Sequence, residues 1–153
     1  MCLIIDANLA SEIFAGDSNP DFLPVIRWLL SENGLMVYGG KNFDELKKIN
    51  RATAFIRELN RLGRADIYQP SEIDEEENVV MKLKLMRSDD PHVIALARVS
   101  GARVVCTNDV ALIADFKNVG LVPSPKGKIY RGRQHKALLG HCRGCRGYKK
   151  SKK

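Results

Sequence analysis

The sequence contains no apolar run close to the roughly 20 residues that a membrane-spanning helix needs, although hydrophobic residues make up 44% of its 153 positions. Its N-terminal segment lacks a basic leader, and Asp6 and Glu12 interrupt the first apolar stretch. These absences argue against secretion and against membrane insertion. We therefore predict a cytoplasmic protein that has no membrane association and is long enough to bury a core.

Acidic residues are absent from the last quarter of the sequence. Residues 1–115 contain 13 Lys and Arg and all 18 Asp and Glu, a net charge of −5, whereas residues 116–153 contain 12 Lys and Arg and no acid. An acidic body can concentrate divalent cations, and a basic segment can hold a polyanion, first of all nucleic acid. We divide the chain into a body, residues 1–125, and a basic tail, 126–153, whose segments 128–130 and 138–139 could still pack on the body.

Short apolar segments alternate along the body with segments of helical period. Strands are expected at residues 2–5, 35–38, 65–69 and 103–106, with a fifth at 119–122. The helices expected between them cover residues 8–15, 19–31, 42–62, 71–87, 90–101 and 109–116. Strands that alternate with helices require crossover connections, so we predict an α/β fold with a mostly parallel central sheet that is flanked by helices on both faces.

Four acidic residues fall where this fold would place a functional site. Asp6 directly follows the first strand, and Asp109 follows the strand that ends at Cys106. Asp90 begins the helix that feeds the same strand, and Glu45 lies in the first turns of the helix after the second strand. Ligands in open α/β sheets bind beyond the carboxyl ends of the strands. We therefore expect these four acids to converge at that edge.

Such a cluster has a clear chemical use. Carboxylates at close range repel one another unless cations neutralise them. Mg²⁺ and Mn²⁺ are hard cations that prefer carboxylate oxygen, and a bound metal can activate water, hold a phosphate and stabilise the departing oxygen. The four acids are therefore predicted to bind Mg²⁺ or Mn²⁺ and to catalyse hydrolysis of a phosphodiester.

Each acid also has a purely structural alternative. Asp6, Asp90 and Asp109 could each cap the helix that follows, and Glu45 could pair with Lys41 or Lys48 on its own helix. Two neighbouring acids compete for the roles of Glu45 and Asp90, namely Asp44 and Asp89.

Polar residues beside the acids are candidates for binding substrate. Asn8 follows the first strand, and Thr107 and Asn108 follow the strand that ends at Cys106, so all three could bond to phosphate or to a water on the metal. Turn formation explains Thr107 and Asn108 equally well. Asp115 is expected to be a surface acid at the end of a helix, with at most a supporting role.

The sequence resembles the PIN-domain nucleases over residues 1–122. The resemblance is carried by Asp6-Ala7-Asn8 after an apolar strand, Glu45-Leu46, Asp90-x-x-Val93-x-x-x-Ala97 and Thr107-x-Asp109. It implies a Rossmann-like sheet, one or two Mg²⁺ or Mn²⁺ ions, and single-stranded or structured RNA as the usual substrate. Many small members are ribonuclease toxins of toxin–antitoxin pairs, which would imply an antitoxin-like inhibitor as a partner.

The basic tail carries two further predictions. Its cations are interleaved with Gly and Tyr and could hold the phosphates of RNA, the candidates being Arg131, Arg133, Lys136, Arg143 and Arg146. A solubilising, disordered tail is the alternative. Four side chains could also supply tetrahedral zinc ligands, although the spacing of the two histidines is unusual: His135, His141, Cys142 and Cys145.

Three functions remain open on this sequence. A metal-dependent endoribonuclease is the leading hypothesis, and a non-catalytic RNA-binding or assembly module with a PIN fold is the alternative. A phosphoacceptor or phosphatase domain is less favoured, because position 8 is Asn where a phosphatase would carry a second Asp. We also expect a homodimer that pairs through an apolar N-terminal surface formed by Phe14, Phe22, Leu23 and Trp28.

Overall fold

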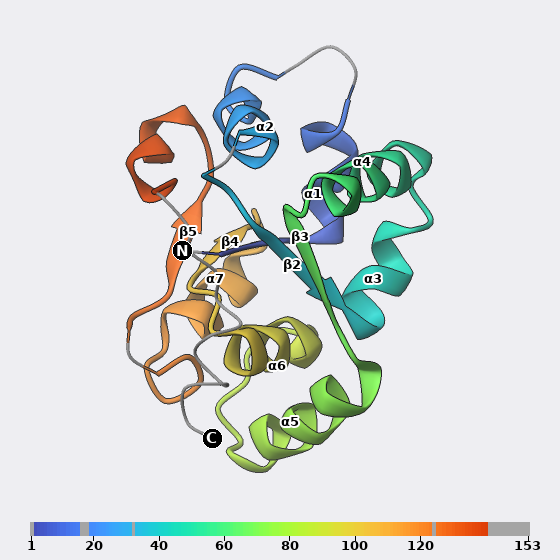
Figure 1. The fold of residues 1–153 in the computed structure, drawn as a ribbon. Helices are drawn as coiled ribbons and strands as arrows, with labels where there is room; N and C mark the ends of the chain where they lie inside the picture. The colour runs from blue at the N-terminus through green and yellow to red at the C-terminus, as the bar shows by residue number, and fades with distance from the viewer. Residues whose placement is uncertain (1, 16–18, 32, 124, 141–153) are drawn as a thin grey trace.

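A five-stranded parallel sheet forms the centre of the molecule (Figure 1). The structure is a computed structural model that describes residues 2–15, 19–31, 33–123 and 125–140. The strands lie in the order β3-β2-β1-β4-β5, and every neighbouring pair is parallel. Their bounds are β1 Leu3–Ile5, β2 Met36–Gly39, β3 Ala65–Tyr68, β4 Val104–Cys106 and β5 Lys128–Tyr130. The predicted α/β class and parallel sheet are confirmed.

Helices cover both faces of this sheet. Helices α1, α2 and α4 lie on one side and α5, α6 and α7 on the other, while α3 contacts members of both layers at one end of the sheet (Figure 1). Their bounds are α1 Ala7–Ile13, α2 Leu23–Leu30, α3 Gly40–Leu46, α4 Asn50–Arg61, α5 Pro70–Lys82, α6 Pro91–Ser100 and α7 Val110–Lys117, with a 3₁₀ helix, η1, at Arg133–Leu138. Within the described ranges no helix is long and apolar enough to cross a bilayer.

The strand order reverses next to β1. The chain proceeds outward from β1 to β2 and β3, and then returns to β4 and β5 on the opposite side of β1. The carboxyl ends of β1 and β4 therefore stand at the point where successive crossovers leave in opposite directions. In open α/β sheets this switch point is the usual location of a ligand site.

The helix expected at residues 42–62 is divided in two, so that prediction was wrong. Helix α3 ends at Leu46, and α4 begins at Asn50 after Ile49 has adopted an extended conformation. The Thr53 hydroxyl donates to the carbonyl oxygens of Lys47 and Ile49, which stabilises the turn between the helices. The apolar period continues across this turn, because Leu46 on α3 and Ile56 on α4 both enter the core. The period alone therefore does not reveal the break.

The fifth strand also lies elsewhere than expected. Residues 119–122 form a turn, in which the backbone N–H groups of Leu121 and Val122 donate to the carbonyl oxygen of Asn118. The edge strand is instead β5, where Ile129 and Tyr130 are buried and pair in register with Val105 and Cys106. The ordered sheet thus extends beyond the expected boundary at residue 125.

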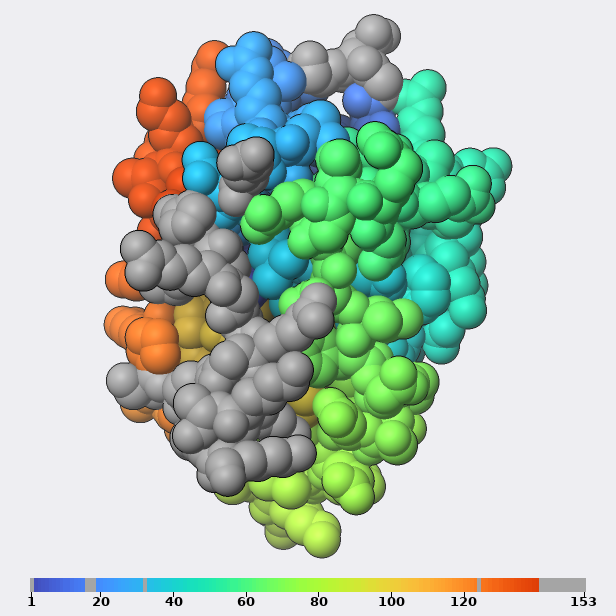
Figure 2. All heavy atoms as spheres, in the orientation of Figure 1, coloured from blue at the N-terminus to red at the C-terminus, as the bar shows by residue number. Residues whose placement is uncertain are grey.

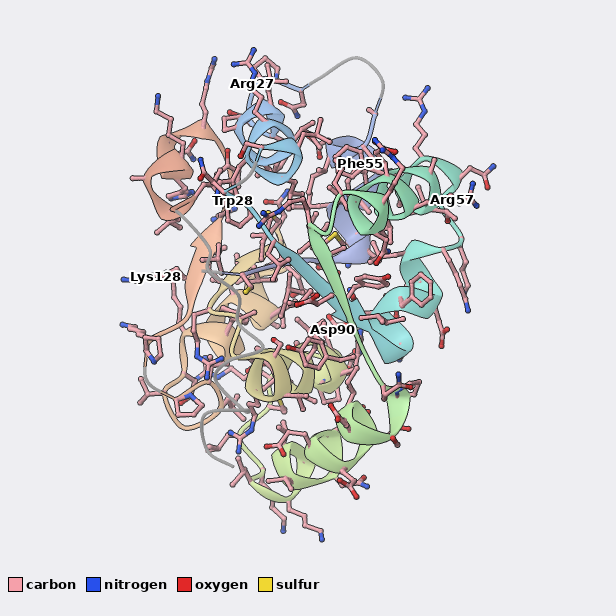
Figure 3. All side chains as sticks on the ribbon, in the orientation of Figure 1. Arg27, Trp28, Phe55, Arg57, Asp90 and Lys128 are labelled. Carbon is pink, nitrogen blue, oxygen red and sulfur yellow. The ribbon has the colours of Figure 1, made fainter. Side chains whose placement is uncertain are left out.

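The apolar surface proposed for a homodimer is largely internal. Phe14, Phe22 and Trp28 are all buried, and only Leu23 is half-exposed. Phe14 packs on the ring of Phe55 with centroids 4.9 Å apart, and the Trp28 indole N–H donates to the carbonyl oxygen of Gly140 at 2.7 Å. Trp28 and Phe55 both point inward between the helices and the sheet (Figure 3). These residues therefore build the core and are not available as a pairing surface.

Arg103 connects three segments from inside the protein. Its side chain is 2% exposed, and its guanidinium donates to the carbonyl oxygens of Ala97, Ala102 and Pro123 at 2.7–3.0 Å. These bonds join the end of α6, the start of β4 and the loop that leads toward β5. A buried charge is stable only when its donors are satisfied in this way.

We predict that Arg103→Met lowers the free energy of unfolding by at least about 3 kcal/mol, because it removes several charge-assisted hydrogen bonds that join three segments inside the protein. The matched control is Arg57→Met, since Arg57 projects from α4 into solvent (Figure 3). That change should stay within about 0.5 kcal/mol. Urea denaturation measures both, and equal effects would contradict a structural role for Arg103.

Candidate functional site

Asp6 stands at the carboxyl end of β1 and is almost fully buried. Its Oδ1 accepts the backbone N–H of Asn8 at 3.3 Å and so caps α1, while its Oδ2 accepts the hydroxyl of Thr107 at 2.7 Å. Each carboxylate oxygen has two lone pairs, so both oxygens of Asp6 retain the capacity to bind a further donor or a cation.

Asp109 is held beside Asp6 by the same hydroxyl. Thr107 follows β4 and is fully buried, and its Oγ1 also accepts the backbone N–H of Asp109 at 3.1 Å. The Oδ1 of Asp109 caps α7 by accepting the N–H groups of Ala111 and Leu112. Asp6 and Asp109 therefore both cap helices, which was the structural alternative considered for them. Thr107 links the two acids at the switch point.

Asp90 lies at the N-terminus of α6 but does not cap it with its side chain. Burial raises the pKa of Asp90, and the negative charges of Asp6, Asp109 and Glu45 raise it further, while Lys41 acts in the opposite direction. The other three predicted acids are thus near enough to repel the carboxylate of Asp90. In Figure 3, Asp90 is seen between α6 and the sheet.

Glu45 faces this cluster from α3. Its Oε1 lies 4.0 Å from Nε2 of His92, which is buried on α6. Burial, with a smaller contribution from Lys41, lowers the pKa of His92 to about 4, so the imidazole is neutral at pH 7 and this contact is not an ion pair. The two neighbouring acids that were the alternatives to Glu45 and Asp90 lie at the surface: Asp44 pairs with Lys47 in solvent, and Asp89 is exposed.

A sharp backbone turn brings α3 to this edge. Gly39 has φ 152° and Gly40 has φ 58°, and a Cβ at Gly39 would lie 2.4 Å from the carbonyl oxygen of Tyr68. Glycine is therefore required between β2 and α3. One turn before Glu45, the buried Asn42 donates its side-chain amide to the carbonyl oxygen of Ile5 at 3.1 Å, which fastens α3 to the end of β1.

Asp115 proves to be an interior residue and not the expected surface acid. It is 1% exposed on α7, and its carboxylate accepts the backbone N–H groups of Arg87 and Ser88 at 2.8–3.2 Å. Ser88 in turn accepts the N–H of Asp90 through its hydroxyl at 3.3 Å. Asp115 therefore positions the loop that presents Asp90.

The candidate substrate-binding residues occupy different surroundings. Asn8 and Asn108 are exposed beside the acids, whereas Thr107 is buried and bonded to Asp6. Arg131 and Lys136 are exposed around η1. Arg143 and Arg146 lie outside the described residues.

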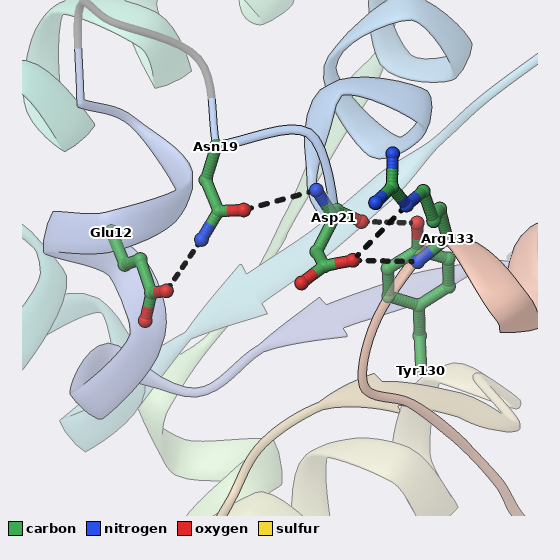
Figure 4. A network of polar contacts seen from close by, with 5 residues as sticks. All are labelled: Glu12, Asn19, Asp21, Tyr130 and Arg133. Atoms are coloured by element: carbon green, nitrogen blue, oxygen red, sulfur yellow. Dashed lines mark hydrogen bonds and ion pairs between the residues drawn. The ribbon is translucent and has the colours of Figure 1, made fainter.

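Arg133 belongs to a polar network that ties η1 to the N-terminal half (Figure 4). Its Nε lies 3.7 Å from Oδ1 of Asp21, and the hydroxyl of Tyr130 donates to the Asp21 carbonyl oxygen at 2.6 Å. The N–H of Asp21 donates to the Asn19 side chain, which reaches Glu12 on α1. Burial raises the pKa of Tyr130 to about 12, so its hydroxyl keeps its proton as a donor.

The zinc prediction falls mostly outside the described residues, because His141, Cys142 and Cys145 all lie there. His135 is described on η1, where its Nδ1 accepts the backbone N–H of Arg131 at 3.1 Å. The ring is thus engaged in local structure through one of its two nitrogens.

Sequence reasoning missed two residues of the site, Lys41 and His92. Lys41 is exposed, and its charge acts on both Asp90 and His92. It precedes Glu45 by four positions on one helix, and His92 follows Asp90 by two. The helical spacing indicated Lys41 only as a partner of Glu45, since residues i and i+4 share a face, and not as a charge that acts on Asp90 and His92.

The atoms that the four acids and their neighbours could offer to a metal determine which cation would fit this cluster. Among the described residues, no three His, Cys, Asp or Glu side chains are assembled into a ready metal-binding group. The acids supply hard oxygen donors only, and two buried polar atoms on the surrounding elements have no hydrogen-bond partner, Asn42 Oδ1 and His92 Nδ1. These residues fit a hard cation that is held through one or two carboxylates and keeps much of its water, as Mg²⁺ commonly does.

Comparisons with known proteins give no match: no family model, no curated protein and no solved structure resembles this chain significantly.

We predict that Asp90→Asn stabilises the metal-free protein at pH 7 by about 1–3 °C in Tm, because it removes a charge that its neighbours repel. The folded-state pKa of Asp90 is raised, so the destabilisation is fully present above that pKa. It disappears as pH falls below the ordinary value of about 3.8.

Thermal denaturation in EDTA from pH 4 to pH 8 measures this difference. The control is Asp89→Asn, a change to the exposed neighbouring acid. If Asp90→Asn melts at or below the wild-type temperature at pH 7, the repulsion inferred for this cluster is wrong.

Proposed function

We propose that this chain is a divalent-metal-dependent endoribonuclease with a Rossmann-like PIN domain, and that Asp6, Glu45, Asp90 and Asp109 are its catalytic acids. The observation that carries the proposal is the convergence of four acids, from four separate elements, at the switch point of a parallel sheet. Helix capping alone would explain why Asp6 and Asp109 are acidic residues. It does not account for Asp90, which leaves its helix uncapped and stands near three other negative charges.

Asp6, Glu45, Asp90 and Asp109 are the candidate ligands, of which one or two would hold the cation directly while it keeps much of its water. A bound Mg²⁺ or Mn²⁺ would supply a Lewis acid for the phosphodiester and a source of hydroxide at neutral pH. The cap bonds of Asp109 use Oδ1, which leaves Oδ2 without a cap bond. Asp90 has its whole carboxylate available, because it makes no cap bond.

The protein positions these acids through supporting hydrogen bonds. Thr107 fixes Asp6 and Asp109 relative to each other, Asn42 fixes α3, and Asp115 fixes the loop before Asp90. Such bonds maintain the geometry that an active site needs. Lys41 is the cation at this edge, and we assign it to the phosphate group of the substrate, whose charge it can neutralise.

RNA is the proposed substrate on two grounds. The motif residues that resemble PIN-domain nucleases are the residues that converge, and the chain continues into a segment rich in Lys and Arg that suits a polyanion. A non-catalytic RNA-binding module with the same fold is the second candidate. The absence of an assembled three-ligand metal group among the described residues favours that candidate, and the presence of all four acids favours the enzyme.

Cleavage of end-labelled single-stranded RNA, with single-stranded DNA of the same sequence in parallel, tests the proposal. We expect the wild-type chain to cleave RNA in Mn²⁺ or Mg²⁺ and not in excess EDTA. Asp90→Asn and Glu45→Gln should each lower the rate by about 100-fold or more, because a cation site contributes several kcal/mol to stabilising the transition state.

The matched controls are Asp89→Asn and Asp44→Asn, which alter the exposed neighbour of each acid. Both should stay within about twofold of wild type, which corresponds to less than about 1 kcal/mol. Undiminished cleavage in EDTA would eliminate the metal-nuclease proposal. RNA binding without cleavage in either metal, and without any rise in Tm on addition of Mn²⁺, would identify the non-catalytic module.

A further inference from the structure

A cavity of about 440 Å³ opens at the outer edge of the sheet, between α7, β5 and η1. Five basic or ionisable side chains line it, and we call it the basic groove: Lys117, Lys126, Lys128, Arg131 and His135. The remaining lining is aliphatic apart from one glycine, and no carboxylate contributes to it. The volume falls within the range of ligand-binding clefts.

The charges of this groove are not compensated within the described part of the protein. Lys117, Lys126, Lys128 and Arg131 are all exposed, and none of them forms an ion pair with an acid among the described residues. Arg98 and Arg133 differ in this respect, because each has a carboxylate partner. A concave surface lined by one sign of charge attracts ligands of the opposite sign.

A rigid frame holds these cations. Gly127 packs so closely on α7 that a Cβ there would lie 2.1 Å from the carbonyl oxygen of Phe116. The backbone N–H of Lys128 donates to the carbonyl oxygen of Arg103 at 2.8 Å, which fixes β5 against β4. Beyond the strand, the N–H of Arg131 donates to the ring of His135. In Figure 3, Lys128 projects from β5 away from the sheet.

The groove extends toward the acidic site along the same edge. Asp109 caps one end of α7, and Lys117 lies at the other end of that helix, roughly 12 Å away at 1.5 Å per residue. Tyr130 pairs in register with Cys106, so Arg131 follows β5 where Thr107 follows β4. Neighbouring strands are about 4.8 Å apart. Arg131, at one end of the groove, therefore lies one strand away from Thr107, which bonds to Asp6 and Asp109. The segment that contains α7 and β5, orange in Figure 2, reaches the surface on that side of the molecule.

We propose that the basic groove binds the sugar–phosphate backbone of a single-stranded RNA and directs that strand to the acidic site. The proposal rests on the proposed function, which it deepens by assigning the path of the substrate. Phosphate is the anion that both ends of this path accept, since Lys and Arg pair with it directly and the acids accept it through a divalent cation. An acidic peptide, by contrast, would suit the basic groove but not the acidic site.

The test uses the full chain and fluorescence anisotropy of an unstructured, labelled single-stranded RNA in EDTA, which permits binding without cleavage. The variant Lys128→Glu/Arg131→Glu reverses two charges of the groove. We expect its Kd to rise at least about tenfold and its salt dependence to become shallower, by roughly 0.7 in log–log slope for each phosphate that the variant no longer neutralises. The control Arg51→Glu/Arg57→Glu changes the net charge equally on exposed positions of α4, and it should bind nearly as wild type.

A second variant, Lys128→Gln/Arg131→Gln, removes the same charges without introducing repulsion and keeps the test valid if the first variant does not fold. Unchanged affinity and salt slope in a folded groove variant would overturn the proposal, as would an equal loss in the control. Displacement of the RNA by polyglutamate as effective as displacement by unlabelled RNA would also overturn it, in favour of an acidic protein partner.

Cleavage kinetics separate this proposal from the proposed function. In Mn²⁺ the groove variants should show a raised KM with kcat close to wild type, because the four acids are intact. Suppose that the groove variants weaken RNA binding while the wild-type chain cleaves in neither metal. The proposal of a nuclease is then wrong, whereas the assignment of the basic groove as an RNA-binding site still holds.

Discussion

The hydrogen bond from Thr107 to Asp6 joins the carboxyl ends of the two central strands, and the rest of the site is arranged around it. Its donor follows β4 and its acceptor follows β1, 101 positions apart in the sequence. The same hydroxyl accepts the backbone N–H of Asp109, so one buried side chain sets the positions of two acids. Parallel strands in register make this possible, because Ile5 and Cys106 are paired and the next residues emerge side by side.

Gathering acids at this point has an electrostatic cost, which the fold offsets only in part. The N–H groups at the starts of α1 and α7 donate hydrogen bonds to the carboxylates of Asp6 and Asp109. Asp90 has no such bond from its own helix, and its pKa is raised by burial and by its acidic neighbours. Asp90 thus stands where α6 meets the switch point without a cap bond to its carboxylate, and a cation bound there would relieve the repulsion from its neighbours.

The sequence was sufficient to predict elements that have strong local signals. Asp6 was found because it directly follows an apolar strand, Asp109 because it comes three residues after one and begins a helix, and Asp90 because it precedes a proline at a helix start. The break between α3 and α4 was not predictable, since the apolar period continues through it. Strand β5 was missed because its only apolar residues, Ile129 and Tyr130, lie within a basic segment. The burial of Asp115 was missed because it depends on hydrogen bonds to a loop 27 positions away in the sequence.

The positions of β5 and Asp115 also change the meaning of the charge division along the chain. On sequence alone, all the acids lie in residues 1–115 and the segment after them is purely basic, which predicted an acidic body and a separate basic tail. In the structure, Lys128 and Arg131 adjoin an edge strand of the same sheet, and α7 carries Asp109 at one end and Lys117 at the other. The acids thus lie at one end of α7 and the cations along β5 and at the other end of that helix, an arrangement in which one phosphate could react among the acids while its neighbours were held by the cations. Removal of the chain after residue 125 would therefore remove part of the sheet along with those cations.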